Sequence, residues 1–385
     1  MAEKGNATVT LMAGGDIGPV YEPTEQFAEL ISPVLQQADL RFAQCERTYS
    51  ERGSDPQFTD GYGGLSGYHS RLHPRMAAVW KAAGIDIVSM AGNHTMDWGP
   101  EAALDTVELF RGMGKYVIGA GRDAEEARKP AIIERKGVKI AFLAYCSVLR
   151  SGQAAGKGKV GMAPMRAHTY YAPVEYAPGS PPKIITVPYE EDVQALQEDV
   201  RKAKQQADVV IMSIHWGLPG IPKTILAHQP PVAHAAIDAG ADLILGHHAH
   251  SIKAIEVYKG KVCFYSICNF MTTGAPRPMT TPAHSFEWKL FGYAQIDEEC
   301  LPPNGMYNFP SHSRKTMVVK AVISKKGIER VSFLPTFINH RAQPYVVAPD
   351  DPKFQEILEF TEWVSDQHPH KFRVEGNEVV VDTSV

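Results

Sequence analysis

Short, almost wholly apolar segments alternate with helix-like segments along residues 7–250. The apolar segments are predicted strands: Ala7–Ala13, Leu40–Ala43, Ile85–Met90, Lys115–Ile118, Asp208–Ile214 and Leu243–Leu245. The segments between them carry apolar residues at helical spacing and are predicted helices: Thr24–Gln37, His73–Ala83, Pro100–Gly112, Glu190–Ala207 and Pro231–Ala239. A strand that is apolar on both faces has to be covered on both faces, so we expect an α/β fold.

Other segments depart from this alternation. Residues 131–146 and 252–266 each predict a β-hairpin around a Lys-Gly turn, so we expect mixed sheets. Residues 163–188, which are rich in Pro and Tyr, and residues 271–284 predict long loops. After residue 300, paired strands, a helix and a last strand predict a C-terminal subdomain packed on the main domain.

The composition excludes several classes of protein. A formal net charge of −4 and the lack of any basic run argue against binding to nucleic acid or to a membrane surface. The apolar stretch Val9–Ala13 is too short for a signal peptide or a membrane anchor, so we expect a cytoplasmic protein. The 5 cysteines are scattered and form no C-x-x-C pair, so neither a disulfide framework nor a zinc ribbon is predicted.

Residues that can bind metals follow most of the apolar segments. They are Asp16, Glu46, the pair Asn93 and His94, His215, and the group His247, His248 and His250. The carboxyl ends of strands in an α/β sheet share one edge, and ligands bind there. The sequence therefore predicts one cleft that gathers carboxylates, an amide and imidazoles, a mixture that suits Zn, Mn, Fe or Ni.

Each motif also has an ordinary structural explanation when it is taken alone. An Asp after two glycines is commonly a turn residue, and an isolated Glu such as Glu46 is commonly exposed. His215 follows a buried run, so it is as easily a core histidine as a ligand. The histidine cluster is a stronger indication, because His248 and His250 face the same side of an extended chain. Only the motifs together, in this order, indicate a single metal site.

The order of the motifs resembles the signature of the calcineurin-like metallophosphoesterases, and more fully their CapA-like branch, the poly-γ-glutamate capsule biosynthesis proteins. The resembling segments, which span roughly residues 8–345, are Gly15-Asp16, Asp39-Leu40 with Glu46, Ala91–Gly99, His215–Gly217, Gly240–His250, and Tyr265-Ser266 with Asn269-Phe270. The resemblance implies an α/β (α+β) fold, a four-layer αββα sandwich of two mixed β-sheets flanked by helices. Residues 1–300 would form the metallophosphoesterase-like catalytic domain, and residues 301–385 a small appendage.

The resemblance also implies two divalent transition-metal ions as cofactors. The ligands of the first would be Asp16, Glu46 and His250. The ligands of the second would be Glu46, Asn93, His215 and His248, with Glu46 bridging the two ions. Two ions this close can lower the pKa of a shared water and offset negative charge on the substrate.

Other residues would take part in catalysis or bind substrate. His94 would be the catalytic acid or the partner of the transition state, oriented by Asp97 about one helical turn later. Arg122, Asn269 and His247 would bind substrate, with a place among or beside the metal ligands as the alternative for His247. The expected partner is a small-molecule substrate, and the sequence leaves the oligomeric state open.

The sequence departs from the family patterns near the expected cleft. Most metallophosphoesterases carry Asp-x-His at the first strand, whereas this chain has Asp16-Ile17-Gly18. His69 and His73 are candidates to complete that first metal site. CapA relatives usually carry an acidic residue soon after His-Trp-Gly and a glycine before Asn-Phe, where this chain has Leu218–Gly220 and Cys268.

We therefore expect a metal-dependent hydrolase that uses a metal-activated water, with a phosphoester as the first choice of substrate. One alternative keeps the metal site but hydrolyses an amide, an ether or a carboxylic ester, because Arg47 and Arg122 are the only cations near the strand ends that could receive a phosphate. The other alternative is a non-catalytic accessory protein in the synthesis of poly-γ-glutamate or a similar capsule polymer.

Overall fold

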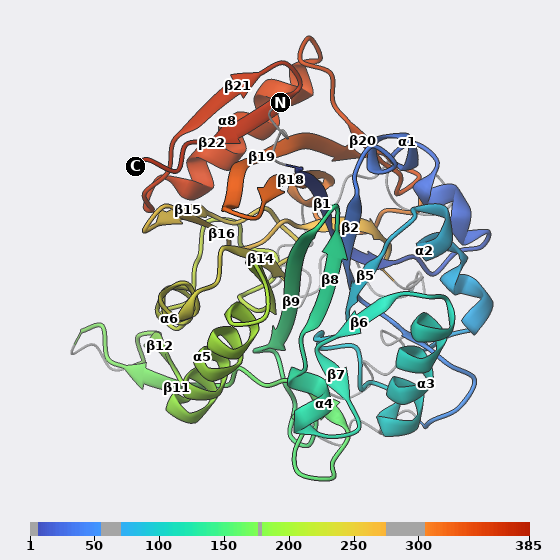
Figure 1. Cartoon of the computed structure of the whole chain (residues 1–385). Coiled ribbons are helices and arrows are strands. Elements are labelled where there is room, and N and C mark those ends of the chain that lie inside the picture. The colour runs from blue at the N-terminus through green and yellow to red at the C-terminus, as the bar shows by residue number, and fades with distance from the viewer. Residues whose placement is uncertain (1–6, 55–70, 176–178, 275–304) are drawn as a thin grey trace, which may run out of the picture.

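Two mixed β-sheets form the centre of the computed structural model, which describes residues 7–54, 71–175, 179–274 and 305–385. Helices α2 and α3 lie beside the first sheet, and α5 and α6 lie beside the second (Figure 1). The α/β class and the mixed sheets predicted from the sequence are confirmed.

The first sheet has 10 strands, and β1 lies near its middle. Its path is β21 (Phe372–Glu375), β22 (Glu378–Val381), β19 (Gly327–Ile338), β18 (Lys315–Ser324), β1 (Val9–Gly18), β2 (Leu40–Cys45), β5 (Ile87–Ser89) and β6 (Tyr116–Ile118), with β17 (Asn269–Thr272) beside β1 and β20 (Pro344–Val346) beside β19. Strands β17, β1, β2, β5 and β6 are parallel, whereas β18 is antiparallel to β1. The parallel half therefore sends several strand ends to one edge.

The second sheet has 6 strands. Its path is β15 (Ile255–Tyr258), β16 (Lys261–Phe264), β14 (Leu243–His247), β13 (Val209–His215), β9 (Val138–Cys146) and β8 (Ala131–Arg135). The four inner strands are parallel, and the outer pairs β8–β9 and β15–β16 are the two predicted hairpins. Short two-stranded ladders also form between β3 (Thr48–Tyr49) and β4 (Arg71–Leu72), and between β7 (Ala120–Gly121) and β10 (Gly161–Met162).

Strand β9 shows why the second sheet is covered on both faces. Ile140, Phe142 and Ala144 belong to the core that the two sheets share, and Phe142 stacks on Phe42 of β2 with ring centroids 6.3 Å apart. The intervening residues, such as Leu143, belong to a second core under α5 and α6. Side chains alternate between the faces of a strand, so an uninterrupted apolar run fills both cores.

Several helices have a proline in the first turn, and one has a glycine directly after its last residue. They are α1 (Ser32–Leu35), α2 (Ala78–Ala82), α3 (Gly99–Gly112), α4 (Ala124–Arg128), α5 (Glu190–Lys204), α6 (Gln229–Ala239) and α8 (Pro352–Ser365). Helix α3 has Pro100 in its first turn and buries Ala103, Val107 and Phe110 at helical spacing. Helix α6 ends at Gly240, whose φ of 119° is left-handed.

Prolines lie within two predicted helices. The segment Thr24–Gln37 forms a 3₁₀ turn at Thr24–Ala28 and the short helix α1, which has Pro33 in its first turn. The segment His73–Ala83 likewise begins with a 3₁₀ turn at Pro74–Ala77 before α2. Proline lacks an N–H donor and disfavours helical geometry at the preceding residue, which explains the interruption between Ala28 and Ser32. Pro74 lies at the first position of its turn, so that turn runs without a break into α2.

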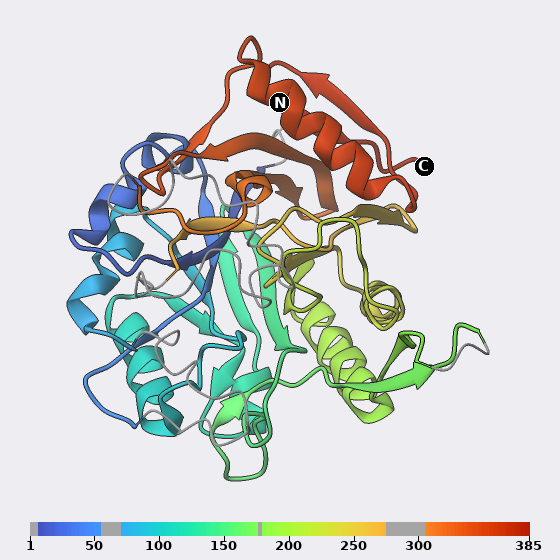
Figure 2. The same cartoon turned by 180° about the vertical axis from the view of Figure 1, so that it is seen from behind.

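The prediction of a long loop at residues 163–188 is wrong in part. Strands β11 (Ala167–Ala172) and β12 (Lys183–Pro188) form an antiparallel hairpin that projects from the body of the molecule (Figures 1 and 2). The prolines that suggested a loop lie mostly between the two strands, where they do not interrupt the ladder. Of the second predicted loop, residues 275–284 lie outside the described residues.

The C-terminal segment continues the first sheet. Strand β18 pairs with β1 from Val9 opposite Ile323 to Ala13 opposite Val319, and α8 packs on β19. The predicted paired strands, the helix and the last strand are therefore present. The division of the chain near residue 300 stays a prediction.

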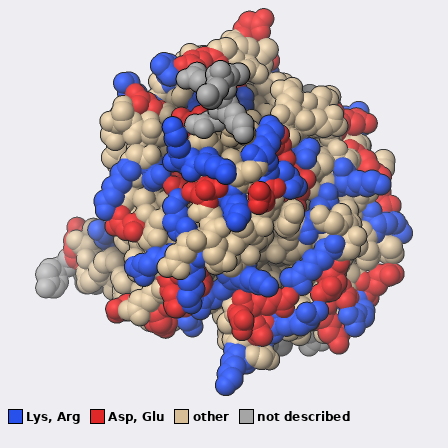
Figure 3. All heavy atoms as spheres, in the orientation of Figure 1, with Lys and Arg blue, Asp and Glu red and all other residues tan. Residues whose placement is uncertain are grey.

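Basic and acidic side chains are intermingled on the face shown in Figure 3. This distribution agrees with the small formal net charge of −4. Within the described part of the chain, no helix combines the length and the apolar character needed to cross a membrane.

Candidate metal centre

The carboxyl ends of parallel strands from both sheets bring the predicted site residues together. Strands β1, β2, β5, β13 and β14, with the turns that follow them, carry Asp16, Glu46, Asn93, His94, His215, His247, His248 and His250. All of these side chains are buried or half-buried. Parallel strands end at a common edge, which is why residues so far apart in sequence lie together here.

One group of possible ligands consists of Asp16, Glu46 and His250. One ligand atom of each lies within 4.8 Å of the other two. Nε2 of His250 is 3.4 Å from Oε1 of Glu46, and its Nδ1 is 3.7 Å from Oδ2 of Asp16. Nδ1 of His247 is 3.2 Å from the other oxygen of Asp16. Carboxylates and imidazoles placed in this way can hold a divalent metal ion.

A second group lies on the other side of Glu46. Nε2 of His215 is 2.7 Å from Oδ1 of Asn93 and 3.8 Å from Oε2 of Glu46. The ring of His248 lies beside that of His215, with centroids 4.8 Å apart. The two oxygens of Glu46 thus approach different histidines, Oε1 approaching His250 and Oε2 approaching His215. A carboxylate in this position can bridge two metal ions.

Many polar atoms of both groups are buried without a hydrogen-bond partner among the described residues. They are Oδ1 of Asp16, both carboxylate oxygens of Glu46, Nδ1 of His215, Nδ1 of His248 and both ring nitrogens of His247. A buried polar atom without a partner costs roughly 1–3 kcal/mol, so native proteins rarely concentrate such atoms in one place. Oxygen and nitrogen donors together fit a divalent transition metal, so these residues match the cofactor that the sequence predicts.

Burial controls the protonation of these groups. It raises the pKa of Glu46 well above its ordinary value, the charge of Asp16 adds to the rise, and the charge of Arg47 opposes it. Burial lowers the pKa of His215 well below its ordinary value, and the surrounding histidines lower it further. The pKa of His248 is lowered in the same way. Both histidines are therefore neutral near neutral pH, and neutral imidazole is the form that binds metals.

The part of β1 that carries Asp16 requires a glycine before it. A Cβ at Gly15 would lie 1.9 Å from the backbone oxygen of Cys268, and the N–H of Asp16 donates to that same oxygen at 3.2 Å. Strands β1 and β17 can approach this closely only because residue 15 has no side chain. The Gly-Asp motif is thus explained by packing as well as by chemistry.

His94 and Asp97 form a hydrogen-bonded pair at the rim of the cluster. Nδ1 of His94 is 2.5 Å from Oδ2 of Asp97, and Nη1 of Arg150 is 3.3 Å from the other carboxylate oxygen. Nε2 of His94 is 3.2 Å from Nδ2 of Asn93 and 3.8 Å from Oε1 of Glu46. The pair therefore directs one ring nitrogen to Asp97 and leaves the other beside the candidate ligands.

Residues 3–273 match a family model described as "Bacterial capsule synthesis protein PGA_cap". The chain belongs to the PGA_cap family. The matched region contains all the candidate metal ligands. The resemblance to CapA-like proteins that the sequence motifs suggested is therefore confirmed.

Curated relatives of this PGA_cap protein include two proteins named CapA. "PGA biosynthesis protein CapA" of Bacillus subtilis is 32% identical over 206 residues, which are 53% of this chain and 47% of that protein. "Capsule biosynthesis protein CapA" of Bacillus anthracis is 29% identical over 191 residues, which are 50% of this chain and 41% of that protein. A "Probable polyglutamine synthesis accessory protein" of Mycobacterium tuberculosis is 28% identical over 207 residues, covering 51% of this chain and 47% of that protein. The chain spans about half the length of the curated relatives it matches.

A solved structure also aligns with this PGA_cap protein. It is titled "GAP50 the anchor in the inner membrane complex of Plasmodium", and the alignment covers 93% of this chain and 96% of that chain. The TM-score is 0.35 and the identity 12%.

Two residues that were predicted to bind substrate are buried beside the ligands in this PGA_cap protein. Asn269 pairs with Asp16 between β17 and β1, and its Oδ1 is 2.7 Å from Nδ1 of His250. His247 is fully buried, and its ring centroid is 5.7 Å from that of Phe42. Asn269 is thus placed to orient His250, and the substrate-binding roles of both residues stay predictions.

The remaining predicted residues have partners outside the cluster. Arg122 is exposed, and its Nη2 donates to Oε1 of Glu108 at 2.8 Å. Nε2 of His73 is 3.3 Å from Oε1 of Glu51. His69, the other candidate to complete the first metal site, lies outside the described residues. A role for Arg122 in binding substrate stays a prediction.

The sequence did not indicate the residues after position 305 that support His250. Nδ2 of Asn269 donates to the hydroxyl of Tyr307 at 2.8 Å, and this hydroxyl donates to the backbone oxygen of Ser313 at 2.6 Å. The hydroxyl of Ser313 donates to the backbone oxygen of His250, and the ring of Phe309 lies 4.8 Å from that of His250. These residues lie beyond the PGA_cap match and form no motif, so no signal in the sequence could have found them.

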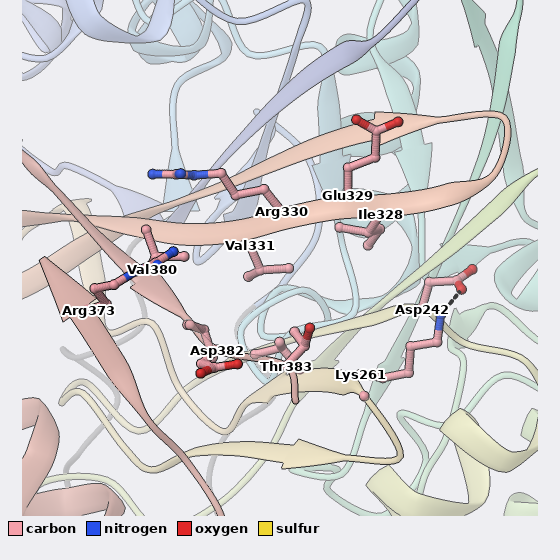
Figure 4. Close-up of a pocket in the computed structure, with 13 residues that line it drawn as sticks. Asp242, Lys261, Ile328, Glu329, Arg330, Val331, Arg373, Val380, Asp382 and Thr383 are labelled. Carbon is pink, nitrogen blue, oxygen red and sulfur yellow. Dashed lines mark hydrogen bonds and ion pairs between the residues drawn. The ribbon is translucent and has the colours of Figure 1, made fainter. Parts of the chain in front are cut away.

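A pocket of about 330 Å³ is lined in part by residues of β16, β19 and β22. Figure 4 shows the side chains that line it. Asp242, which lines it, directly precedes β14, whereas His247 ends that strand. Nζ of Lys261 is 2.8 Å from Oδ1 of Asp242, and Nη1 of Arg330 is 2.5 Å from Oε2 of Glu375. The pocket contains none of the predicted site residues, and these two cations are already engaged by carboxylates.

Proposed function

We propose that this PGA_cap protein is a metal-dependent hydrolase that acts on a phosphoester. The observation that carries the proposal is the set of buried ligand atoms on Asp16, Glu46, His215 and His248 that have no hydrogen-bond partner within the described part of the chain. A folded chain that gathered these atoms for no ligand would lose stability at each of them. A centre with two divalent ions of Mn, Zn, Fe or Ni, shared through Glu46, would satisfy both groups.

The protein residues around the ions would hold them and move one proton. When bound, a divalent ion would supply Lewis-acid chemistry that acidifies water and offsets charge on a phosphoryl oxygen. Asp97 holds a proton on Nδ1 of His94, so Nε2 is the atom that faces the cluster. Protonated His94 can donate from Nε2 to the oxygen of the leaving group. Asn269 would keep the ring of His250 in place through its contact with Nδ1.

The fold that we propose for this function is the four-layer αββα sandwich of the calcineurin-like proteins. Its support is the alternation along β9, whose side chains enter the core between the sheets and the core under α5 and α6 in turn. The second sheet therefore has another sheet on one face and helices on the other.

A second candidate function is a non-catalytic role in polymer synthesis. It is favoured by the relative from Mycobacterium tuberculosis, whose name describes a polyglutamine synthesis accessory protein. Metal in such a protein would serve structure or binding, and no hydrolysis would follow.

A substrate panel at equal metal loading separates these functions. We expect Mn-loaded protein to hydrolyse aryl phosphate monoesters or diesters, and to lose this activity on treatment with a chelator. Carboxylic esters and anilides of the same aryl leaving group test the alternative bonds. Metal-dependent cleavage of these esters or anilides alone would refute the phosphoester assignment, and metal binding without any cleavage would favour the accessory role.

A further inference from the structure

A closed circuit of hydrogen bonds runs from the ring of His250 back to its own backbone. Oδ1 of Asn269 is 2.7 Å from Nδ1 of His250, and Nδ2 of the same amide donates to the hydroxyl of Tyr307 at 2.8 Å. That hydroxyl donates to the backbone oxygen of Ser313 at 2.6 Å, and the hydroxyl of Ser313 donates to the backbone oxygen of His250. The circuit therefore joins a candidate metal ligand to the segment after residue 305.

The partners of His250 in this circuit are shielded from bulk water. Asn269, Tyr307 and Ser313 are each 0% exposed. Because no bulk water can replace a lost partner at such a depth, each donor needs an acceptor inside the protein. The directions of these hydrogen bonds can therefore be worked out from the protein groups that form them.

The backbone oxygen of Ser313 sets the direction of the hydrogen bonds that lead to His250. A carbonyl oxygen only accepts, so the single hydrogen of the Tyr307 hydroxyl points to Ser313. The oxygen of Tyr307 must then accept from Asn269, which turns the NH₂ group of this amide to Tyr307 and its oxygen to His250. With the amide reversed, one hydroxyl hydrogen would have to serve two acceptors, and one pair of oxygens would lie in contact without a hydrogen between them.

This direction determines which ring nitrogen of His250 carries a hydrogen. The amide oxygen of Asn269 only accepts, so Nδ1 of His250 has to donate to it. A neutral imidazole has one N–H group, so its lone pair is on Nε2. Nε2 is the nitrogen that lies 3.4 Å from Oε1 of Glu46, another candidate ligand.

We propose that Tyr307 is a positioning residue of the metal centre, which acts through Asn269 to keep the hydrogen of His250 on Nδ1, so that Nε2 binds the metal. A partner on the far nitrogen of a metal-binding histidine fixes the tautomer and the orientation of the ring. This inference rests on the metal centre of the proposed function. Tyr307 lies beyond the family match, which ends at residue 273, so the role belongs to a part of the chain that the family model does not cover.

The affinity for Mn tests this role without any turnover. Titration calorimetry would compare metal-free wild type with Tyr307→Phe, which keeps the aromatic ring and removes the hydroxyl. We expect the Kd for Mn to rise about 10- to 100-fold, as is usual when the partner of a ligating histidine is lost. The matched control is Tyr145→Phe, because the buried hydroxyl of Tyr145 donates to Asp199 at 2.7 Å in the core under α5 and α6. This change should leave the Kd unaltered.

The tautomer itself is measured by NMR on metal-free protein in which the ring nitrogens of histidine are isotope-labelled. We expect His250 of the wild type to carry its hydrogen on Nδ1, and Tyr307→Phe to show a mixture of the two tautomers. A His250→Asn sample identifies the signals of this ring. A substitution that only lowered stability would leave the wild-type tautomer in place.

The outcomes separate this inference from the proposed function. An unchanged Kd for Mn or an unchanged tautomer in Tyr307→Phe overturns the inference. If this variant does not fold, Asn269→Leu, which removes the acceptor of His250, is judged by the same two measurements. A wild-type protein that binds no Mn overturns both proposals. A wild type that binds Mn with the Nδ1–H tautomer but hydrolyses no phosphoester would refute the proposed function and leave the role of Tyr307 intact.

Discussion

Glu46 and His94 lie close together in the candidate metal centre but differ in burial and in their hydrogen-bond partners. Both oxygens of Glu46 are buried with no hydrogen-bond partner in the described ranges, and they approach histidines of the two ligand groups. His94 keeps one nitrogen on Asp97 and is the more exposed of the two, with 16% of its side chain accessible. Glu46 is thus suited to hold ions, and His94 to exchange a proton with a substrate.

His94 is placed to take part in turnover without binding metal. We expect His94→Ala to lower kcat by about 100- to 10,000-fold, which is the usual contribution of a general acid, while the metal content is unchanged. Steady-state kinetics and elemental analysis of the same sample measure both quantities. His73→Ala, at a half-exposed histidine paired with Glu51, serves as the control and should behave as wild type. Full activity of the His94 variant would contradict the role given to it.

Glycines matter at the scale of the strands because they set how closely two elements approach. Gly15 lies where β1 passes the backbone of Cys268, whereas a Cβ added to Gly112 at the end of α3 would meet no atom within 4 Å. The same substitution should therefore have opposite effects at these two positions.

We expect Gly15→Ala to lower the free energy of unfolding by more than about 2 kcal/mol and to reduce the metal content, because the new methyl group must displace β17 or Asp16. Gly112→Ala should be neutral, or should stabilise by roughly 0.5–1 kcal/mol through its better helix propensity. Urea unfolding of both variants measures the two energies. Equal effects at the two positions would show that the close approach at Gly15 is not what constrains this part of β1.

The strands and the helices differed in how well the sequence predicted them. Apolar runs such as Val209–His215 and Leu243–His247 were found because a buried strand needs apolar residues on both faces. The helix predicted at Thr24–Gln37 was too long. The prediction relied on the helical spacing of the apolar residues and neglected the break that Pro33 causes. The hairpin of β11 and β12 was missed because its apolar side chains are largely exposed, so it lacks the pattern of a half-buried strand.

The candidate site was predicted better than its surroundings. Asp16, Glu46 and His250 were selected because each follows a predicted strand, and the structure places their ligand atoms together. The supports of His250, such as Tyr307 and Ser313, depend on contacts between distant segments. Such contacts leave no local pattern, so they could not be predicted without the fold.

For the molecule as a whole, buried histidines couple stability to pH. Burial lowers the pKa of His228 to about 4 and, together with nearby lysines, that of His312 to about 4. A histidine whose pKa is lower in the folded state binds fewer protons there than in the unfolded state. Its contribution to stability is present above the unfolded value of 6.5 and is lost as the pH falls toward 4.

We therefore expect the Tm of metal-free protein to fall by roughly 5 °C or more between neutral pH and a pH near 5. Differential scanning calorimetry with a chelator present measures this, and His228→Asn with His312→Asn serves as the comparison, because it removes two of the groups that must become charged. A Tm that does not depend on pH over this window, or the same slope in the double variant, would show that these histidines do not control the acid response.

The strand ends of the two sheets bring the candidate ligands together, so the metal content of the protein shows whether they bind metal. Elemental analysis of chain purified without chelator, and again after incubation with Mn or Zn, should give about two divalent ions per chain. Glu46→Ala should lose most of this metal, because its carboxylate lies between both groups of ligands. A wild-type chain that holds no metal after both treatments would show that these residues do not form a metal centre.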